Sequence, residues 1–96
     1  MQYYVYILSN NSNTTLYTGV TNDLAKRISE YKLHLDKNSF SSRYNTVKLV
    51  YYEFTESAET AIEREKKVKK LSRINKIKLI EKMNPQWLDL WDQITT

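Results

Sequence analysis

Two short strand-forming runs near the start of the sequence place the tightest limit on the fold. Residues 3–8 and residues 15–20 are rich in aromatic and β-branched side chains, which favour β-strands. The residues between them, Ser-Asn-Asn-Ser-Asn-Thr, are all turn formers, and their number suits an antiparallel hairpin with a loose loop. The sequence therefore predicts that the chain begins with a β-hairpin.

The register of this hairpin decides which side chains share a face. We expect Tyr6 to lie opposite Tyr17 and Tyr4 opposite Gly19, which puts three phenols on one face. Strands favour tyrosine for structural reasons alone, so this row of phenols is either packing or chemistry. Gly19 is the only glycine in the chain, and a glycine inside a strand indicates a bulge or a close approach to the backbone.

The rest of the chain reads as helices around one further strand. Asn22 can cap a helix that runs to about residue 34, and residues 36–45 are polar and irregular. Residues 47–54 form a third strand, which we expect in the middle of the sheet.

Two serines and one Asn-Pro pair punctuate the second half of the chain. Ser57 and Ser72 begin helices, and Asn84-Pro85 stops the later one; an amphipathic tail then packs back. The order strand-strand-helix-strand-helix-helix predicts an α+β domain, with a small three-stranded antiparallel sheet flanked by helices.

Length and composition limit the classes of protein that remain. A chain of 96 residues suits a single domain over 1–96, and 41% apolar and 27% charged residues are typical of globular proteins. Cysteine is absent, which excludes disulfides, thiolate zinc sites and a cysteine nucleophile. The sequence has neither a membrane-spanning stretch nor a secretory signal, so we expect no membrane partner and a cytoplasmic location, as a monomer or weak homodimer.

One segment carries the whole excess of positive charge. Residues 64–82 contain nine basic and two acidic side chains, against a net charge of +4 for the chain. Such a segment is either a solvated helix face or a surface for a polyanion. If it contacts nucleic acid, the residues that line the strand path are Lys66, Lys67, Lys69, Lys70, Arg73 and Lys76.

A single carboxylate stands out on the helix that follows Ser57. At about 100° per residue, Glu65 falls within the apolar stripe of Ala61, Ile62 and Val68, whereas Glu63 falls on the polar side. A carboxylate that faces a core must be paired, protonated or bound to a cation. Glu65 is therefore either the partner of an Arg or Lys or a metal ligand.

The first helix carries a second group of polar side chains. Arg27, Tyr31 and His34 are spaced so that they align along one edge of its apolar stripe. A guanidinium can bind a phosphoryl group through a planar fork of donors, but an arginine at such an edge can equally be a surface residue.

These residues together resemble the GIY-YIG nuclease family. The resemblance rests on Tyr4-Val5-Tyr6 and Tyr17-Thr18-Gly19, followed in order by Arg27 and Glu65, and it extends over nearly the whole chain. The segments 16–24, 48–53, 65–70 and 83–87 are similar to the short single-domain bacterial members. The first motif departs from the family pattern, because Tyr4 stands where the family has glycine.

The resemblance implies a site and a reaction. In such enzymes a glutamate holds one divalent cation, an arginine contacts the scissile phosphate, and a tyrosine is the general base for water. Carried over, these are Glu65, Arg27, and either Tyr6 or Tyr17, and we favour Tyr6 as the base with Tyr17 orienting the water or phosphate. Near Tyr17 we expect the backbone at Gly19 to approach the nucleic-acid phosphate. Tyr31, which we count among the catalytic residues, stands where the family often has histidine.

The implied activity is hydrolysis of DNA phosphodiesters with Mg²⁺ or Mn²⁺. One carboxylate and a substrate phosphate can complete the oxygen shell of Mg²⁺. With no room for a recognition module, we expect structure-specific or weakly sequence-specific cleavage, which would suit DNA repair or processing. Two alternatives stay open: a nucleic-acid-binding module that has lost catalysis, and a protein that acts on RNA.

Overall fold

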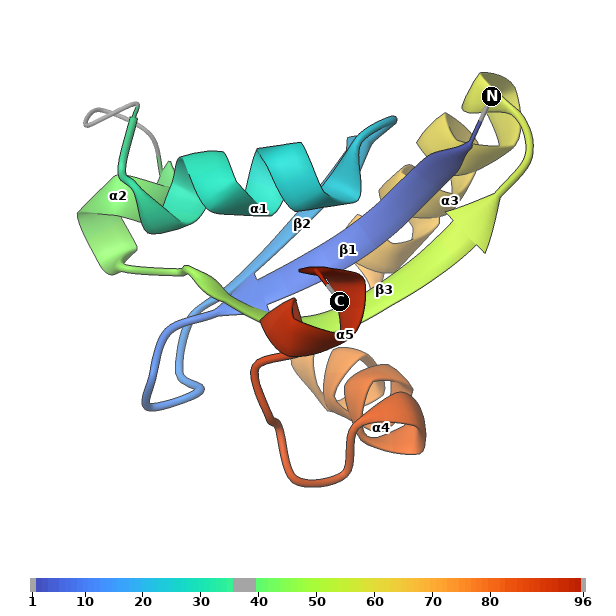
Figure 1. Cartoon of the computed structure of the whole chain (residues 1–96). Helices are drawn as coiled ribbons and strands as arrows, with labels where there is room; N and C mark the ends of the chain where they lie inside the picture. The colour runs from blue at the N-terminus through green and yellow to red at the C-terminus, as the bar shows by residue number, and fades with distance from the viewer. Residues whose placement is uncertain (1, 36–39, 96) are drawn as a thin grey trace.

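The sheet has three antiparallel strands, and the N-terminal strand lies in its centre. In the computed structural model, which describes residues 2–35 and 40–95, β1 (Tyr3–Ser9) pairs with β2 (Leu16–Thr21) on one side and with β3 (Lys48–Thr55) on the other (Figure 1). The α+β fold is as expected. The placement of the third strand in the middle is wrong, because β1 is the strand buried along most of its length, while the second half of β3 is partly exposed.

The hairpin register differs from the expected one by two residues. Tyr6 pairs with Gly19 and not with Tyr17. The side-chain oxygen of Asn10 accepts hydrogen bonds from the backbone nitrogens of the last two loop residues, at 2.9 and 3.1 Å. These bonds hold both residues in the loop, so the pair of strand residues next to the loop is Ser9 with Leu16. A shift of two residues keeps every side chain on its face, so Tyr6 and Tyr17 still share one.

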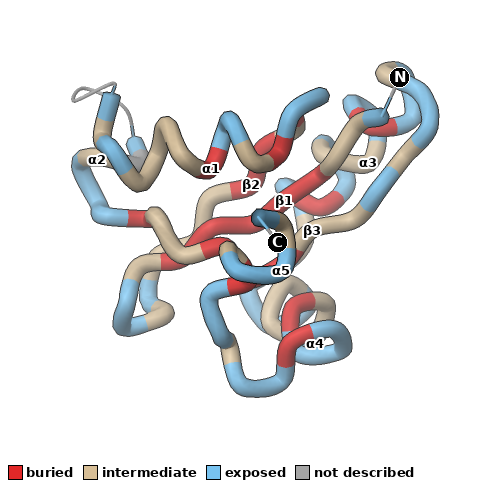
Figure 2. Tube along the Cα trace, in the orientation of Figure 1, coloured by how far each residue is buried: buried red, intermediate tan, exposed pale blue. Residues whose placement is uncertain are grey.

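Helices cover both faces of the sheet. On one face lie α3 (Ala58–Lys70) and α4 (Arg73–Met83), and on the other lie α1 (Leu24–Lys32) and α5 (Trp91–Thr95) (Figure 1). Each face has its own buried core, seen in red in Figure 2. The core under α3 and α4 contains Val5, Ile7, Val50, Tyr51, Ala61, Val68 and Ile80, and the core under α1 and α5 contains Tyr6, Leu8, Leu24, Ile28, Leu49 and Leu90.

The helix boundaries follow the capping residues. The side chains of Ser57 and Ser72 accept hydrogen bonds from backbone nitrogens of the first turns of α3 and α4, as predicted. The N-cap of α1 is Asp23, one residue later than expected. In the segment predicted to be irregular, residues 40–44 form a short helix, α2 (Phe40–Tyr44), and residues 36–39 lie outside the described residues.

None of the helices in the described ranges has the length and apolar content needed to cross a bilayer.

Candidate active site at the β2 edge

A close approach between Tyr6 and Gly19 brings a phenol from the central strand to the edge of the sheet. The two residues are paired across β1 and β2, and a Cβ atom built at position 19 would lie 2.3 Å from Tyr6 Oη and 2.4 Å from its Cζ. No side chain fits in that space. The pairing of β1 with β2 continues through Gly19 without a change of register. Of the two explanations expected for a glycine in a strand, the structure therefore shows a close approach and not a bulge.

Tyr31 connects the phenols of the hairpin with α1. Its hydroxyl lies 2.7 Å from the hydroxyl of Tyr6, in a hydrogen bond that either can donate. The ring of Tyr17 packs edge-on against that of Tyr31, with centroids 6.0 Å apart. Three phenols therefore meet at one point, on the sheet face that α1 covers.

Burial sets the acidity of these phenols. It strongly raises the pKa of Tyr6, which is 1% exposed, and the hydrogen bond to Tyr31 adds to the effect. Burial also raises the pKa of the half-buried Tyr17, to about 12. The positive charge of Arg27 opposes both shifts but does not overcome them. The protein alone therefore keeps both phenols protonated at neutral pH, whereas a base of the expected kind needs a lowered pKa.

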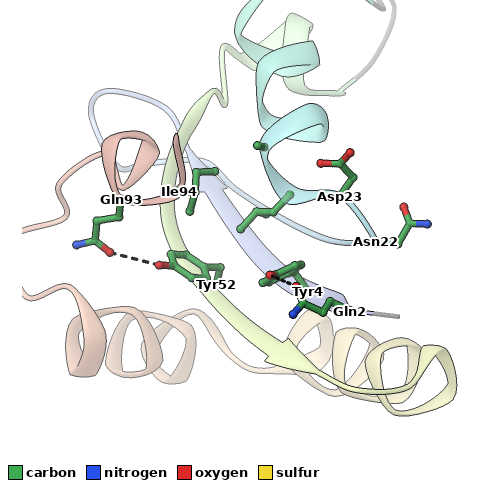
Figure 3. Close-up of a pocket in the computed structure, with 9 residues that line it drawn as sticks. Gln2, Tyr4, Asn22, Asp23, Tyr52, Gln93 and Ile94 are labelled. Carbon is green, nitrogen blue, oxygen red and sulfur yellow. Dashed lines mark hydrogen bonds between the residues drawn. The ribbon is translucent and has the colours of Figure 1, made fainter. Parts of the chain in front are cut away.

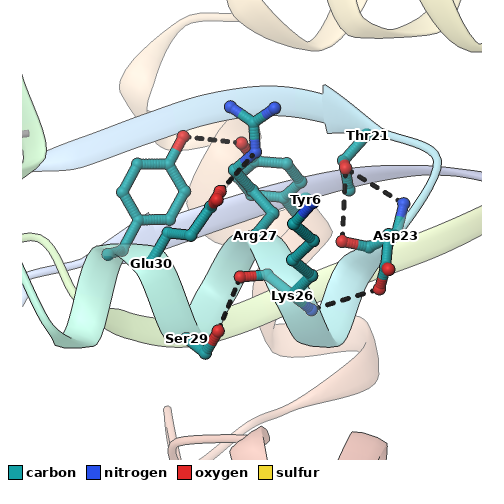
Figure 4. A network of polar contacts seen from close by, with 8 residues as sticks. Tyr6, Thr21, Asp23, Lys26, Arg27, Ser29 and Glu30 are labelled. Carbon is teal, nitrogen blue, oxygen red and sulfur yellow. Dashed lines mark hydrogen bonds and ion pairs between the residues drawn. The ribbon is translucent and has the colours of Figure 1, made fainter. Parts of the chain in front are cut away.

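Arg27 lies one helical turn before Tyr31 and faces a polar pocket. Partial burial lowers its pKa, but the phenols of Tyr6 and Tyr31 and the carboxylate of Glu30 raise it more, so the guanidinium stays charged. Its Nε lies 3.5 Å from Glu30 Oε1, and its terminal nitrogens point away from that contact (Figure 4). The pocket beside it has a volume of about 450 Å³ and is lined by Thr21, Asn22, Asp23, Lys26, Arg27 and Glu30.

Glu65 approaches the same edge from the opposite face of the sheet. Helix α3 buries Ala61 and Val68 against the sheet, and Arg64 pairs with Glu53 of β3. The next residue, Glu65, therefore lies on the flank of α3 that faces β2. Its negative charge adds to the rise in the pKa of Tyr17, after the larger effects of burial and Tyr31.

The side chain of Glu65 is 14% exposed and forms an ion pair with Lys69, with Nζ and Oε1 3.2 Å apart. Among the partners expected for a paired Glu65, the structure thus selects a lysine. Glu63 is exposed, as predicted. Ile62, expected in the buried stripe, is 46% exposed, because it lies beyond the line of contact that Ala61 and Val68 define.

Glu65 is a candidate ligand for a divalent cation. Within the described ranges, no group of three or more His, Cys, Asp or Glu side chains could enclose a metal. Mg²⁺ tolerates such a site, because it keeps several waters and takes one or two carboxylates together with substrate phosphate. Lys69 is 58% exposed and can leave the carboxylate when a cation arrives.

The basic residues of α3 do not all face this edge. Lys66, Lys67, Lys69 and Lys70 are exposed. Lys69 shares the flank of Glu65, whereas Lys67 is three residues beyond Arg64 and lies on the flank toward β3. Beyond α3, Arg73 donates a hydrogen bond to the backbone oxygen of Asn13, at 2.7 Å, and Lys76 is half-buried.

Two further residues near the site differ from the expected picture. His34, aligned in sequence with Arg27 and Tyr31, turns instead toward α2, where its Nδ1 lies 3.1 Å from Ser42 Oγ. Phe40 of α2 stacks on Tyr17 with centroids 5.6 Å apart, a contact that the sequence did not signal because residues 36–45 show no periodicity.

A hairpin and a helix that carry phenols and an arginine, with a carboxylate from a later helix, define the class of the domain. The family model described as the GIY-YIG catalytic domain matches residues 2–78, and the chain belongs to the GIY-YIG family.

Its relatives include short proteins of similar length. A UPF0213 protein of Syntrophus aciditrophicus is 40% identical over 83 residues, which cover 86% of this chain and 93% of the relative. A UPF0213 protein of Clostridium perfringens is 46% identical over 81 residues, 80% of this chain and 81% of the relative. The solution NMR structure of a UPF0213 protein from Bacillus halodurans aligns over the full length of both chains, with 29% identity and a TM-score of 0.59.

We predict that Gly19→Ala destabilises the fold by about 1–3 kcal/mol, because the added methyl group overlaps the ring of Tyr6. In a Tyr6→Ala background the same change should cost far less, since the ring is gone. Urea unfolding of the four proteins in this double-mutant cycle measures the coupling. Equal costs of Gly19→Ala in the two backgrounds would contradict the close approach.

Proposed function

We propose that the chain is an endonuclease that hydrolyses DNA phosphodiester bonds with Mg²⁺ or Mn²⁺. One observation carries the proposal: the phenol of Tyr17 lies within electrostatic reach of both Arg27 and Glu65. These two residues come from helices on opposite faces of the sheet, and neither belongs to the buried cores of the described residues. Their meeting at a phenol suits the hydrolysis of a phosphodiester.

Arg27 is the proposed contact for the scissile phosphate. Its guanidinium is charged, about half exposed and open to a polar pocket. The fork of donors can bind two equatorial phosphate oxygens and stabilise the negative charge that develops on them. The adjacent phenols fix the position of the arginine from one side and Glu30 from the other.

Glu65 is the proposed ligand of the divalent cation. A bound cation supplies neutralisation of the charge on the scissile phosphate and on the leaving 3′-oxygen. The carboxylate of Glu65 lies on the β2 side of α3, because the contact between Arg64 and Glu53 on the β3 side fixes the rotation of the helix.

Of the two phenols, the burial favours Tyr17 as the base, which reverses the roles we assigned from sequence. Tyr6 is enclosed and its hydroxyl is bonded to Tyr31, so an attacking water has no access to it without rearrangement. Tyr17 is half-buried, and its pKa of about 12 is raised less than that of Tyr6. We assign to Tyr17 the proton of the attacking water, and to Tyr6 and Tyr31 the positioning of Tyr17 and Arg27.

The proposed path for the DNA backbone follows the site flank of α3. Lys69 is exposed on this flank beside Glu65, and Lys66 and Lys70 are exposed on the solvent side of the same helix; such lysines bind phosphates without reading bases. Lys67 lies outside this path because it faces the other flank of α3. Arg73 also has a structural role, because it donates a hydrogen bond to the hairpin loop. The substrate is thus selected by backbone shape more than by sequence.

We predict that Glu65→Gln lowers metal-dependent cleavage of plasmid DNA by about 10²- to 10³-fold, the effect of removing one group that stabilises charge in the transition state. Glu63→Gln is the matched control, on the exposed side of the same helix, and should retain the wild-type rate. DNA affinity in EDTA should be unchanged in both. An active Glu65→Gln enzyme would refute the metal role, and inactive wild-type protein would favour a binding module. Parallel RNA substrates test the remaining alternative.

Tyr17, the proposed base, has a pKa of about 12 and is therefore largely protonated at neutral pH. As long as the pH is below this pKa, each unit of increase in pH raises the ionised fraction tenfold. The single-turnover rate of the wild-type enzyme should therefore rise with pH between about pH 6 and pH 9. Tyr17→Phe should lose most of the rate. If the variant keeps a near-normal rate with the same pH dependence, Tyr17 is not the base, and Tyr6→Phe then tests the alternative.

DNA affinity should fall as salt rises. A plot of the logarithm of the association constant against the logarithm of the salt concentration should have a slope of about −0.9 per phosphate neutralised. Lys69→Gln should reduce the slope by about one such unit, because it removes a contact on the site flank. Lys67→Gln, with the same loss of charge on the opposite flank, should leave the slope unchanged. Fluorescence anisotropy in EDTA across a salt series makes the comparison. Equal effects of the two changes would show that DNA does not follow one flank of α3.

A further inference from the structure

Tyr4 is the residue at which this chain departs from the family motif, and the proposed reaction does not use it. Its side chain lies on the same face of β1 as Tyr6, two residues before it, and packs with the cluster that contains Tyr6 and Leu8. Its ring meets Phe54 edge-on, with centroids 5.9 Å apart. A glycine here would leave this part of the sheet face bare.

The ring of Tyr4 forms part of an open pocket between α1, α5 and the sheet. The pocket has a volume of about 380 Å³, in the range that holds small organic ligands. Tyr4 and Tyr52 come from neighbouring strands, the start of α1 forms one side, and Gln93 and Ile94 of α5 form another (Figure 3).

The polar groups of the pocket suit a neutral ligand with its own donors and acceptors. Three amide side chains line it, those of Gln2, Asn22 and Gln93, and each offers both a donor and an acceptor. Hydrogen bonds already orient two of them: Tyr4 Oη donates to Gln2 Oε1 at 3.0 Å, and Tyr52 Oη donates to Gln93 Oε1 at 3.4 Å. Asp23 is a charged residue of the lining, and no cationic side chain among the described lining residues would attract a phosphate.

The pocket adjoins the proposed path of the DNA. Asn22 and Asp23 line both this pocket and the one beside Arg27. A strand whose phosphate contacts Arg27 can thus reach a neighbouring pocket, which is lined by two tyrosines and by amide side chains. Aromatic side chains bind unpaired bases by stacking, and amides or a carboxylate can bond to base edges.

We propose that this pocket receives an unpaired nucleobase from the strand being cut. The proposal rests on the proposed function, since it assumes a nucleic-acid substrate, and it specifies the substrate further: DNA with an extruded or unpaired nucleotide close to the scissile phosphate. Tyr4 supplies the stacking surface in place of the glycine of the family motif. The amides bind the base edge, and Asp23 can accept a hydrogen bond from the amino group of cytosine.

The test compares two duplexes that differ only in the base at one position. One duplex carries a single unpaired deoxycytidine, and the other carries an abasic residue in its place. Binding is measured by fluorescence anisotropy in EDTA, so that no cleavage intervenes. The wild-type protein should bind the first duplex about tenfold more tightly, the size of effect that stacking of one base gives.

Variants at adjacent positions assign that preference to the pocket. Tyr4→Leu should reduce it to about twofold or less, whereas Tyr4→Phe keeps the ring and should retain it. Tyr3→Leu is the matched control, because Tyr3 neighbours Tyr4 on β1 but packs with the core on the opposite face. Gln93→Ala, at an exposed position of α5, should lower the preference as well and gives a second variant if Tyr4→Leu does not fold.

The outcomes separate the two proposals. Equal wild-type affinity for both duplexes would overturn the base pocket and leave the proposed nuclease function standing. A preference that survives both Tyr4→Leu and Gln93→Ala would also overturn it. Failure to bind either duplex at any salt concentration would overturn the proposed function together with this inference.

Discussion

The arrangement of the site depends on the contact between Tyr6 and Gly19. Tyr6 belongs to the central strand, and its ring occupies the space that a side chain at position 19 of the neighbouring strand would need. The bare backbone of Gly19 lets the buried ring lie over β2, the edge strand of the sheet. There its hydroxyl meets Tyr31, which in turn lies beside Arg27. The absence of one methyl group thus connects the core with the surface where the polar residues gather.

The arrangement of the site depends also on the position of β2 at the edge of the sheet. Because no strand within residues 2–35 and 40–95 lies beyond β2, helices from both faces reach its outer side. Helix α1 brings Arg27 and Tyr31 from one face, and α3 brings Glu65 from the other. The rotation of α3 follows from its buried residues and from the contact of Arg64 with Glu53, whose carboxylate also accepts a hydrogen bond from Tyr51 at 2.8 Å. This network on the β3 side directs Glu65 toward β2.

Local signals in the sequence predicted the elements well, whereas relations between elements were harder to predict. Ser57 and Ser72 cap helices where expected, because capping depends on a few adjacent residues. The face shared by Tyr6 and Tyr17 was also right, since alternation along a strand survives a register shift of two. The register itself depends on the side chain of Asn10, and the order of the strands depends on packing that periodicity does not encode. For Glu65 the helical phase was sufficient, but its choice of Lys69 over an arginine was visible only in three dimensions.

The two halves of the site also differ in their separation along the chain. Tyr6, Tyr17, Arg27 and Tyr31 come from one hairpin and the helix that follows it, whereas Glu65 arrives only after a third strand and another helix. Contacts between residues near one another in sequence cost less loop-closure entropy than contacts that must close a long loop. On the proposed mechanism, the groups that hold phosphate therefore belong to one local unit of the chain, whereas the carboxylate that holds the cation depends on a long-range contact. A change that disturbs only the packing of α3 would thus remove the cation ligand and leave the arginine and the phenols in place.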